Sequence, residues 1–222
     1  MKIDYNSEME KIIAALPPLS SKKKLLLHAC CGPCSSAVLE RLSEFFAVTI
    51  YFYNPNIYPQ AEYIRRKDEL KKFLTDFPQG KDISIIENFY EPNDFYTAIN
   101  IEQEPELKQE KERGERCRRC YHFRLQKTFE YAKEHGFDFF TTTLSISPHK
   151  DSEKINTIGK ILSQESTLPQ FLYADFKKKN GFKRSLELSQ EYNLYRQDYC
   201  GCFYSYTQSQ NTQSNYTSEN RI

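Results

Sequence analysis

The chain has 222 residues, which fits one large domain whose core does not need disulfide bonds to fold. Its 31 basic and 30 acidic residues give a net charge of +1, which excludes a chain-wide basic field for nucleic acid. No apolar run approaches the roughly 18 residues of a membrane span. Glu8, Glu10 and Lys11 stand where an export signal would be apolar, so we expect a cytoplasmic protein without membrane contact.

Strand and helix patterns alternate along the chain, starting with a helix opened by a capping box of Ser7 and Glu10. The predicted helices cover residues 9–16, 35–46, 61–77, 118–135 and 152–163, and the predicted strands cover 24–28, 48–53, 83–86, 138–143 and 170–174. This alternation predicts one α/β domain over residues 1–206, with a mainly parallel sheet and helices on both faces. The polar composition of residues 207–222 predicts a disordered tail.

The loops that follow the predicted strands have unusual sequences. In parallel sheets, ligands bind beyond the carboxyl ends of the strands. Because several such loops meet at one edge of the sheet, we expect them to form a single site. These loops cover residues 30–34, 54–59, 143–150 and 175–184.

The seven cysteines are clustered rather than scattered. An odd number of cysteines in a chain without an export signal should stay reduced. Three tight groups about eighty residues apart predict one site assembled from distant loops. The groups are Cys30, Cys31 and Cys34; Cys117 and Cys120; and Cys200 and Cys202.

The first two groups have the chemistry of metal ligands. The first group lies where a strand gives way to a helix, so backbone N–H groups and the helix dipole favour thiolates. Cys117 and Cys120 open a long helix, and their spacing suits one metal ion or one cluster, with a zinc knuckle as the usual competitor. The alternatives without a metal are that the first group is a cysteine-rich turn in the core and that the second group lies at the solvated start of a charged helix. Nearby arginines would partly neutralise thiolates or meet phosphate: Arg113, Arg116, Arg118 and Arg119.

The third group, Cys200-Gly201-Cys202, differs from both. When oxidised, this spacing closes a small, strained and easily reduced ring, which suits catalysis better than structure. Gly201 supplies the backbone freedom that such a ring needs. Asp198, two residues before the pair, is a speculative acid, although a solvated loop carboxylate is the simpler interpretation.

Two partitions of the cysteines stay open. In the first, the first two groups hold an iron–sulfur cluster or a zinc ion through Cys30, Cys31, Cys117 and Cys120, and the third group is a redox dithiol. In the second partition, the cluster is held by Cys30, Cys117 and Cys120. The remaining four cysteines then bind a separate metal ion: Cys31, Cys34, Cys200 and Cys202.

The cysteines sit in longer motifs with characteristic neighbours. These motifs are His28-Ala29-Cys30-Cys31-Gly32-Pro33-Cys34, Tyr53-Asn54-Pro55-Asn56-Ile57, Gly114-Glu115-Arg116-Cys117-Arg118-Arg119-Cys120-Tyr121, Thr142-Thr143-Leu144-Ser145-Ile146-Ser147-Pro148, Asp175-Phe176-Lys177-Lys178 and Tyr199-Cys200-Gly201-Cys202-Phe203-Tyr204-Ser205. Together they resemble the cobalamin-independent epoxyqueuosine reductase family of tRNA modification, over roughly Lys23 to Tyr206.

The resemblance implies a sheet like that of the adenine-nucleotide α-hydrolase (HUP-like) group. It implies a [4Fe–4S] cluster on Cys30, Cys31, Cys117 and Cys120. Cys34 stays a weaker candidate, as a ligand of the second metal ion, iron, in the second partition. The resemblance also implies a redox-active disulfide between Cys200 and Cys202. The implied reaction is the last step of queuosine synthesis, in which the epoxide of epoxyqueuosine at the wobble position of the anticodon is reduced by two electrons. The implied partners are tRNAs with His, Asn, Asp and Tyr type anticodons, and an electron donor protein or reductant.

A tRNA substrate requires contacts to phosphate and to unstacked bases. Five positive charges just beyond a predicted strand end favour phosphate contact: Lys177, Lys178, Lys179, Lys183 and Arg184. A second basic run, over residues 65–72, is better explained as a solvated helix face. Tyr199 and Tyr204, beside the third cysteine group, are candidates for stacking with bases.

Two other functions compete with the reductase. One is a zinc-bearing enzyme that thiolates tRNA or activates nucleotides on a similar sheet. Gly32 and Pro33 offer few free N–H groups for a pyrophosphate, which counts against it. The other is a non-catalytic RNA-binding module with a structural zinc on four cysteines, which leaves Cys200 and Cys202 unexplained.

Overall fold

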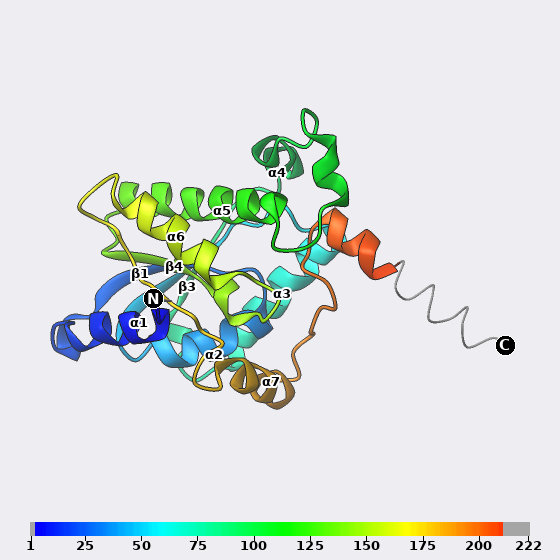
Figure 1. Cartoon of the computed structure of the whole chain (residues 1–222). Helices are drawn as coiled ribbons and strands as arrows, with labels where there is room; N and C mark the ends of the chain where they lie inside the picture. Colours follow the sequence, from blue (N-terminus) through cyan, green and yellow to red (C-terminus); the bar gives the residue numbers. More distant parts are fainter. Residues whose placement is uncertain (1–2, 211–222) are drawn as a thin grey trace.

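The computed structural model describes residues 3–210 and confirms the predicted α/β class, with a parallel sheet and helices on both faces (Figure 1). All pairings in the sheet are parallel, and the strand order is β3-β2-β1-β4-β5. This arrangement is consistent with a HUP-like fold. The strands are β1 (Lys23–His28), β2 (Phe46–Phe52), β3 (Ser84–Glu87), β4 (Phe139–Thr142) and β5 (Gln170–Phe171).

The central strand β1 buries both of its faces, as its continuous apolar run requires. Leu25 and Leu27 pack into one apolar cluster and Leu26 into another on the opposite face of the sheet. The helices on the first face are α1 (Tyr5–Ala14), α2 (Gly32–Leu42), α3 (Gln60–Asp76) and α7 (Gly181–Glu191). Helices α5 (Glu115–Glu134) and α6 (Ser152–Ser163) cover the second face.

A third, smaller apolar cluster ties the end of the described chain to its middle. It brings Cys120 of α5 together with Cys202 and Tyr204 and with Phe95 and Ile99 of α4 (Pro92–Ile99). Residues 203–210 form a further helix, drawn in orange and red in Figure 1. The third cysteine group therefore packs beside the second, although more than eighty residues separate them in the sequence.

Several local expectations differ from the structure. Helix α1 begins at Tyr5 rather than at residue 9, because the carboxylate of Asp4, and not Ser7, accepts hydrogen bonds from the first free backbone N–H groups. Helices α4 and α7 and the helix over residues 203–210 were not predicted. The disordered tail predicted for residues 207–222 is wrong for residues 207–210, which belong to that helix, and residues 211–222 lie outside the described part of the chain.

Within residues 3–210 there is no helix that has both the length and the apolar character needed to cross a membrane. This finding agrees with the polar composition of the chain, in which charged residues make up 27%. The two long helices, α3 and α5, each carry charged side chains along one face and buried side chains along the other.

Helix α6 packs against β5 at Gly159, and this contact leaves no room for a side chain. A Cβ at position 159 would lie 2.4 Å from ring atoms of Phe171. Replacing glycine by alanine within a helix normally stabilises a protein by about 1 kcal/mol, but overpacking a core costs about 1–3 kcal/mol. We therefore expect Gly159→Ala to lower the free energy of unfolding by about 1 kcal/mol, measured by urea denaturation. The double variant Gly159→Ala, Phe171→Leu should recover part of that loss, and a stabilised single variant would contradict this packing.

Candidate thiol-rich site

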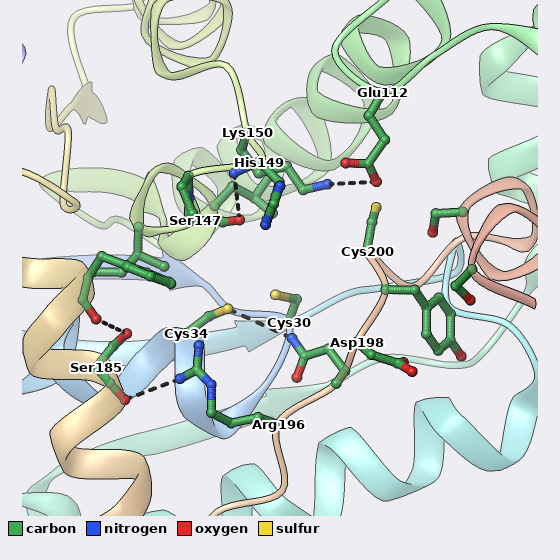
Figure 2. A pocket seen from close by; sticks show the side chains of 18 of the residues that line it. Cys30, Cys34, Glu112, Ser147, His149, Lys150, Ser185, Arg196, Asp198 and Cys200 are labelled. Carbon is green, nitrogen blue, oxygen red and sulfur yellow. Dashed lines mark hydrogen bonds and ion pairs between the residues drawn. The ribbon is translucent and has the colours of Figure 1, made fainter. Parts of the chain in front are cut away.

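A cavity of about 470 Å³ opens beyond the carboxyl ends of β1 and β4 (Figure 2). Its wall contains side chains from loops that are far apart in the sequence, as the order of the strands requires. The lining residues that carry chemistry are Cys30, Cys34, Glu112, Lys150, Asp198 and Cys200. The first and third cysteine groups thus face one cavity.

The first cysteine group forms a compact triad at the start of α2. The three Sγ atoms of Cys30, Cys31 and Cys34 lie within 4.8 Å of one another, an arrangement that can hold a metal ion. Cys31 also caps α2, because its Sγ accepts a hydrogen bond from the backbone N–H of Cys34 at 3.4 Å. The amide of Gln197 donates to the same Sγ at 3.1 Å, which joins the triad to the segment that leads to Cys200.

The pKa values of the triad thiols are shifted in different directions. Hydrogen bonds from Cys31 and Cys34 hold the pKa of Cys30 well below its usual value, against the effect of burial. Burial and the hydrogen bond to Cys30 raise the pKa of Cys31 to about 12. Within the triad, the thiolate form is therefore favoured at Cys30 over Cys31 and Cys34.

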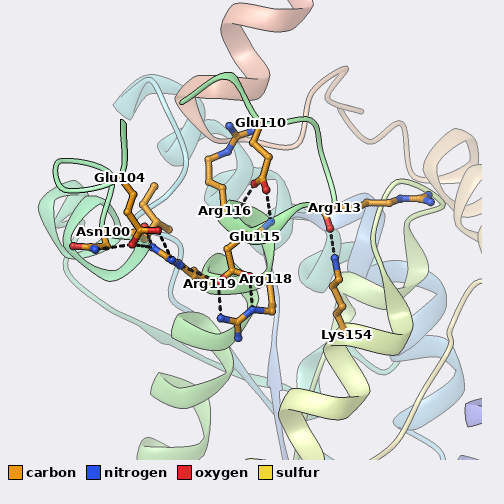
Figure 3. Close-up of polar contacts among 10 residues, drawn as sticks. Asn100, Glu104, Glu110, Arg113, Glu115, Arg116, Arg118, Arg119 and Lys154 are labelled. Carbon is orange, nitrogen blue, oxygen red and sulfur yellow. Dashed lines mark hydrogen bonds and ion pairs between the residues drawn. The ribbon is translucent and has the colours of Figure 1, made fainter. Parts of the chain in front are cut away.

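The second cysteine group lies in the first turns of α5, three residues apart and both 7% exposed. The helix start is capped by the carboxylate of Glu110, which accepts hydrogen bonds from the backbone N–H groups of Glu115 and Arg116 at 2.6 and 2.7 Å (Figure 3). Burial, first of all, raises the pKa of Cys117 to about 11, with the charge of Cys200 as a further cause. The charge on Cys200 therefore acts on the second group.

In the third group, the pKa of Cys200 is lowered, whereas the pKa values of the second group are raised. The seven cysteines are all free thiols in the structure, so Cys200 and Cys202 are not joined. A hydrogen bond from Cys202, together with the ammonium group of Lys150, holds the pKa of Cys200 well below its usual value. Lys150 is 7% exposed, and its Nζ lies 3.9 Å from a carboxylate oxygen of Glu112. In this pair the thiolate form is favoured at Cys200, whereas the hydrogen bond with Cys200 and burial raise the pKa of Cys202.

Arg124 connects the cysteine groups electrostatically. It is 2% exposed, follows Cys120 by one turn of α5, and donates a hydrogen bond to the side chain of Asn54 at 3.4 Å. The charges of Cys120, Cys30 and Cys200 all raise its pKa against burial. Within residues 3–210, no carboxylate lies within 4 Å of its guanidinium, and its Nε has no hydrogen-bond partner. The two thiols whose pKa is lowered, Cys30 and Cys200, are therefore the nearby groups that can supply the negative charge this buried cation needs, whereas burial raises the pKa of Cys120.

A second buried arginine holds the loop of the third group in place. Arg66 of α3 is fully buried and pairs with Glu62 at 2.6 Å. It also donates hydrogen bonds to the backbone oxygens of Cys200 and Tyr199, at 3.2 and 3.3 Å. Gly201 packs against this guanidinium, since a Cβ there would lie 2.9 Å from its Nη1, and its φ of +121° favours glycine.

The structure brings all seven predicted cysteines to one region but places the predicted basic run elsewhere. Lys177, Lys179 and Arg184 do not line the cavity, and each has a carboxylate partner within 2.7 Å. Lys178 is exposed on the same loop. Contact between these side chains and RNA stays a prediction.

The arginines around the second cysteine group also have partners inside the protein. Arg118 and Arg119 pair with Glu115, and Arg119 pairs with Glu104 as well (Figure 3). Arg116 is buried and donates to the backbone oxygen of Leu107. These side chains stabilise the start of α5, and none of the three lines the cavity.

Of the two predicted stacking residues, Tyr199 lines the cavity, whereas Tyr204 is 7% exposed and lies with its ring 4.7 Å from the guanidinium of Arg116. Sequence reasoning did not identify Lys150 and Arg124 as members of the site. The position of Arg124, four residues after Cys120 on one helix face, was the available signal for it.

A parallel sheet with seven thiols gathered beyond its strand ends defines a HUP-like α/β protein with a thiol-rich centre. The sequence model of the family described as "Epoxyqueuosine reductase QueH" matches residues 25–208. The chain therefore belongs to the epoxyqueuosine reductase QueH family, as its motifs predicted.

Similar proteins come from several bacteria and carry the name epoxyqueuosine reductase QueH. The chain is 41% identical to the protein from Streptococcus pyogenes serotype M1 over 207 residues, which cover 92% of this chain and 78% of the relative. It is 42% identical to the protein from Haemophilus influenzae over 186 residues, 82% of this chain and 71% of the relative. It is 33% identical to the protein from Thermotoga maritima over 186 residues, 82% of this chain and 89% of the relative.

The ammonium group of Lys150 should make the thiol of Cys200 more reactive, and this effect can be tested. In the metal-free protein, Lys150→Met should slow alkylation of Cys200 by iodoacetamide severalfold at mildly acidic pH, because the thiolate loses a hydrogen bond and a positive charge. The rate is measured by mass spectrometry of the peptide that contains Cys200. Lys154→Met, at a more exposed lysine on the neighbouring helix α6, is the matched control. Equal rates in the two variants would show that Lys150 does not activate this thiol.

Proposed function

We propose that this chain reduces epoxyqueuosine to queuosine at the wobble position of the tRNA anticodon, the last step of queuosine synthesis in the cytoplasm. Membership of the epoxyqueuosine reductase QueH family supports this activity. The single observation that carries the proposal is that Cys30, Cys34 and Cys200, from two distant segments, line one cavity, and that cysteines of all three groups lie near one buried cation. Several thiols close together suit electron transfer, either as ligands of a metal cluster or as a dithiol that closes to a disulfide.

The cofactor of the proposal is a [4Fe–4S] cluster on Cys30, Cys31, Cys117 and Cys120. The donor set fits an anionic, thiolate-bound group, because these thiols are buried and Arg124 carries a positive charge that no carboxylate within 4 Å in residues 3–210 balances. When bound, such a cluster supplies or accepts electrons one at a time. Cys34 completes the triad with Cys30 and Cys31, so its thiol is available for a second metal ion, which we propose to be iron.

The redox chemistry of the proposal needs two electrons and two protons for each epoxide. When the Cys200 thiolate and the Cys202 thiol close to a disulfide, one S–H bond breaks, one S–S bond forms, and two electrons and one proton are released. The second proton that the epoxide needs comes from another acid of the cavity. The epoxide loses both C–O bonds and becomes an alkene, and its oxygen leaves as water. An electron donor protein or a reductant then returns the disulfide to the dithiol. The stabilised thiolate at Cys200 and the neutral thiol at Cys202 match the two roles of this pair.

The cavity also offers a proton donor to the departing oxygen. Burial raises the pKa of the Glu112 carboxyl, so this group keeps its proton at a higher pH than a carboxyl in water. It lines the same cavity as Cys200, and Lys150 lies between the two groups. Asp198 lines this cavity as well and is the second carboxyl candidate.

The size of the cavity suits one nucleoside rather than a base pair. A volume of about 470 Å³ lies within the ordinary range for small-molecule pockets. A tRNA substrate must therefore turn its wobble nucleoside out of the anticodon loop and into the cavity. The exposed charges of Lys178 and its neighbours Lys177, Lys179 and Arg184 are proposed phosphate contacts, since surface ion pairs are weak and exchange partners easily.

Cysteine variants separate the two proposed roles. Cys117→Ser should remove the visible absorption of the anaerobically reconstituted protein and its acid-labile sulfide, and also turnover, because a serine hydroxyl is a poor cluster ligand. Cys200→Ser should keep both cluster signals and lower turnover by at least a hundredfold, because the dithiol is lost. A Cys200→Ser variant with wild-type turnover would show that the pair is not the electron donor.

The substrate is tested in cells that lack this protein. Nucleoside analysis of their tRNA should show epoxyqueuosine in place of queuosine, and the wild-type chain, but not Cys200→Ser, should restore queuosine. In vitro, the purified iron-loaded protein should convert epoxyqueuosine in a tRNA in the presence of dithionite. A colourless zinc protein that leaves epoxyqueuosine unchanged would contradict the reductase and favour one of the two zinc-bearing alternatives.

A further inference from the structure

Four aromatic side chains form a continuous surface beside the mouth of the cavity. The ring centroids of Tyr199 and Tyr206 lie 5.3 Å apart, those of Tyr206 and Tyr58 5.7 Å, and those of Tyr58 and Phe203 5.1 Å. We call these four residues the aromatic rim. Tyr58 and Phe203 are 37% and 36% exposed, so part of each ring is accessible to a ligand.

The rim continues directly from the cavity wall. Tyr199 lines the cavity and is also the first ring of the rim. The helix over residues 203–210 contributes Ser205 and Gln208 to the wall and Phe203 to the rim, so one helix belongs to both. The part of a ligand that extends out of the cavity on this side therefore contacts aromatic rings.

The rim is held rigidly before any ligand arrives. The hydroxyl of Tyr199 donates to the backbone oxygen of Tyr58, and the backbone N–H of Tyr58 donates to the oxygen of Gly201 at 2.7 Å. The guanidinium of Arg66 lies 5.1 Å from the centroid of the Tyr199 ring. These contacts hold Tyr199 and the backbone of Tyr58 in place, so stacking of a base on this part of the rim costs the protein little further side-chain entropy.

A positive charge lies near this surface. Arg65 of α3 is exposed and stacks its guanidinium 3.3 Å from the centroid of Tyr195, four residues before Tyr199. In residues 3–210, no carboxylate lies within 4 Å of this guanidinium. Rigid aromatic rings beside a cation without an ion-pair partner are the usual composition of a surface for single-stranded RNA.

We propose that the aromatic rim stacks the unpaired anticodon bases next to the nucleotide in the cavity. This inference rests on the proposed function, because it takes RNA as the substrate of the same site. A wobble base that enters the cavity leaves the stack of the anticodon loop, and its neighbours lose a stacking partner. These neighbours are covalently joined to the nucleotide in the cavity and lie at its mouth, where the rim replaces the lost contact.

Binding of an anticodon stem–loop RNA to the holoprotein tests the rim. Phe203→Leu keeps an apolar side chain but removes the ring, and it should weaken binding about tenfold, the order found for one base stacked on an aromatic side chain. Phe203→Trp should bind like the wild type, because it keeps a ring. Phe89→Leu is the matched control, since Phe89 is 93% exposed but lies after β3 and not in the rim.

The same RNA with an abasic nucleotide on one side of the wobble position completes a double-variant cycle. One of the two abasic RNAs should bind the wild type about tenfold more weakly and should lose nothing further with Phe203→Leu. Additive losses with both RNAs, or unchanged binding of the intact RNA, would overturn the proposal. Tyr58→Leu makes the same test from another segment if Phe203→Leu loses the visible absorption of the holoprotein.

Two further outcomes are distinguishable. If Phe203→Leu binds RNA normally but turns over slowly only with a protein electron donor and not with dithionite, the rim contacts that donor, and the proposal is wrong. If the wild type binds the stem–loop but leaves its epoxyqueuosine unreduced, the proposed function fails. In that case the binding cycle still decides whether the rim stacks bases.

Discussion

The site depends on a positive charge that is buried where a carboxylate would normally balance it. Arg124 is almost fully buried and, within residues 3–210, has no carboxylate within 4 Å. An unbalanced charge in the interior costs several kcal/mol, so the fold tolerates it only because thiolates lie around it. Cys30 and Cys200, whose pKa values are lowered, are the groups that can supply that negative charge, and the thiol of Cys120 lies beside the same cation. The same balance makes the pocket suitable for an anionic thiolate-bound centre.

The parallel sheet explains how such distant cysteines meet. The first group follows β1 directly, and the loop that carries Lys150 follows β4, the neighbour of β1 in the sheet. The second group lies at the start of α5, on the face of the sheet that α5 covers. Arg66 then holds the Cys200 loop by two backbone hydrogen bonds, while Gly201 leaves space for its guanidinium. Packing of the elements, and not contact along the sequence, thus creates the centre.

Much of this arrangement was predictable from the sequence, because its signals are local. Leu25, Leu26 and Leu27 show a strand that is buried on both faces, and the spacing of the cysteines shows their shared chemistry. The partners of charged residues were not predictable, because they come from other elements. In the sequence, Lys177 to Arg184 look like a run of basic side chains without partners. In the structure, Glu10 of α1 forms an ion pair with Lys179, and Glu40 of α2 forms one with Arg184. Arg66 sits in a run that read as a solvated helix face, yet it is fully buried.

The grouping of the thiols also refines what the sequence left open. Cys34 lies in a compact triad with Cys30 and Cys31, whereas the charge of Cys200 acts on Cys117, Cys120 and Cys202. The triad can hold a metal ion, and the proposed cluster would instead join two of its thiols, Cys30 and Cys31, to Cys117 and Cys120.

Anomalous diffraction from crystals of the anaerobically prepared holoprotein, recorded on both sides of the iron absorption edge, tests this account most directly. The account predicts iron density between the first and second cysteine groups, bonded to Cys30, Cys31, Cys117 and Cys120. Metal confined to the triad and identified as zinc, with Cys117 and Cys120 unbonded, would contradict it.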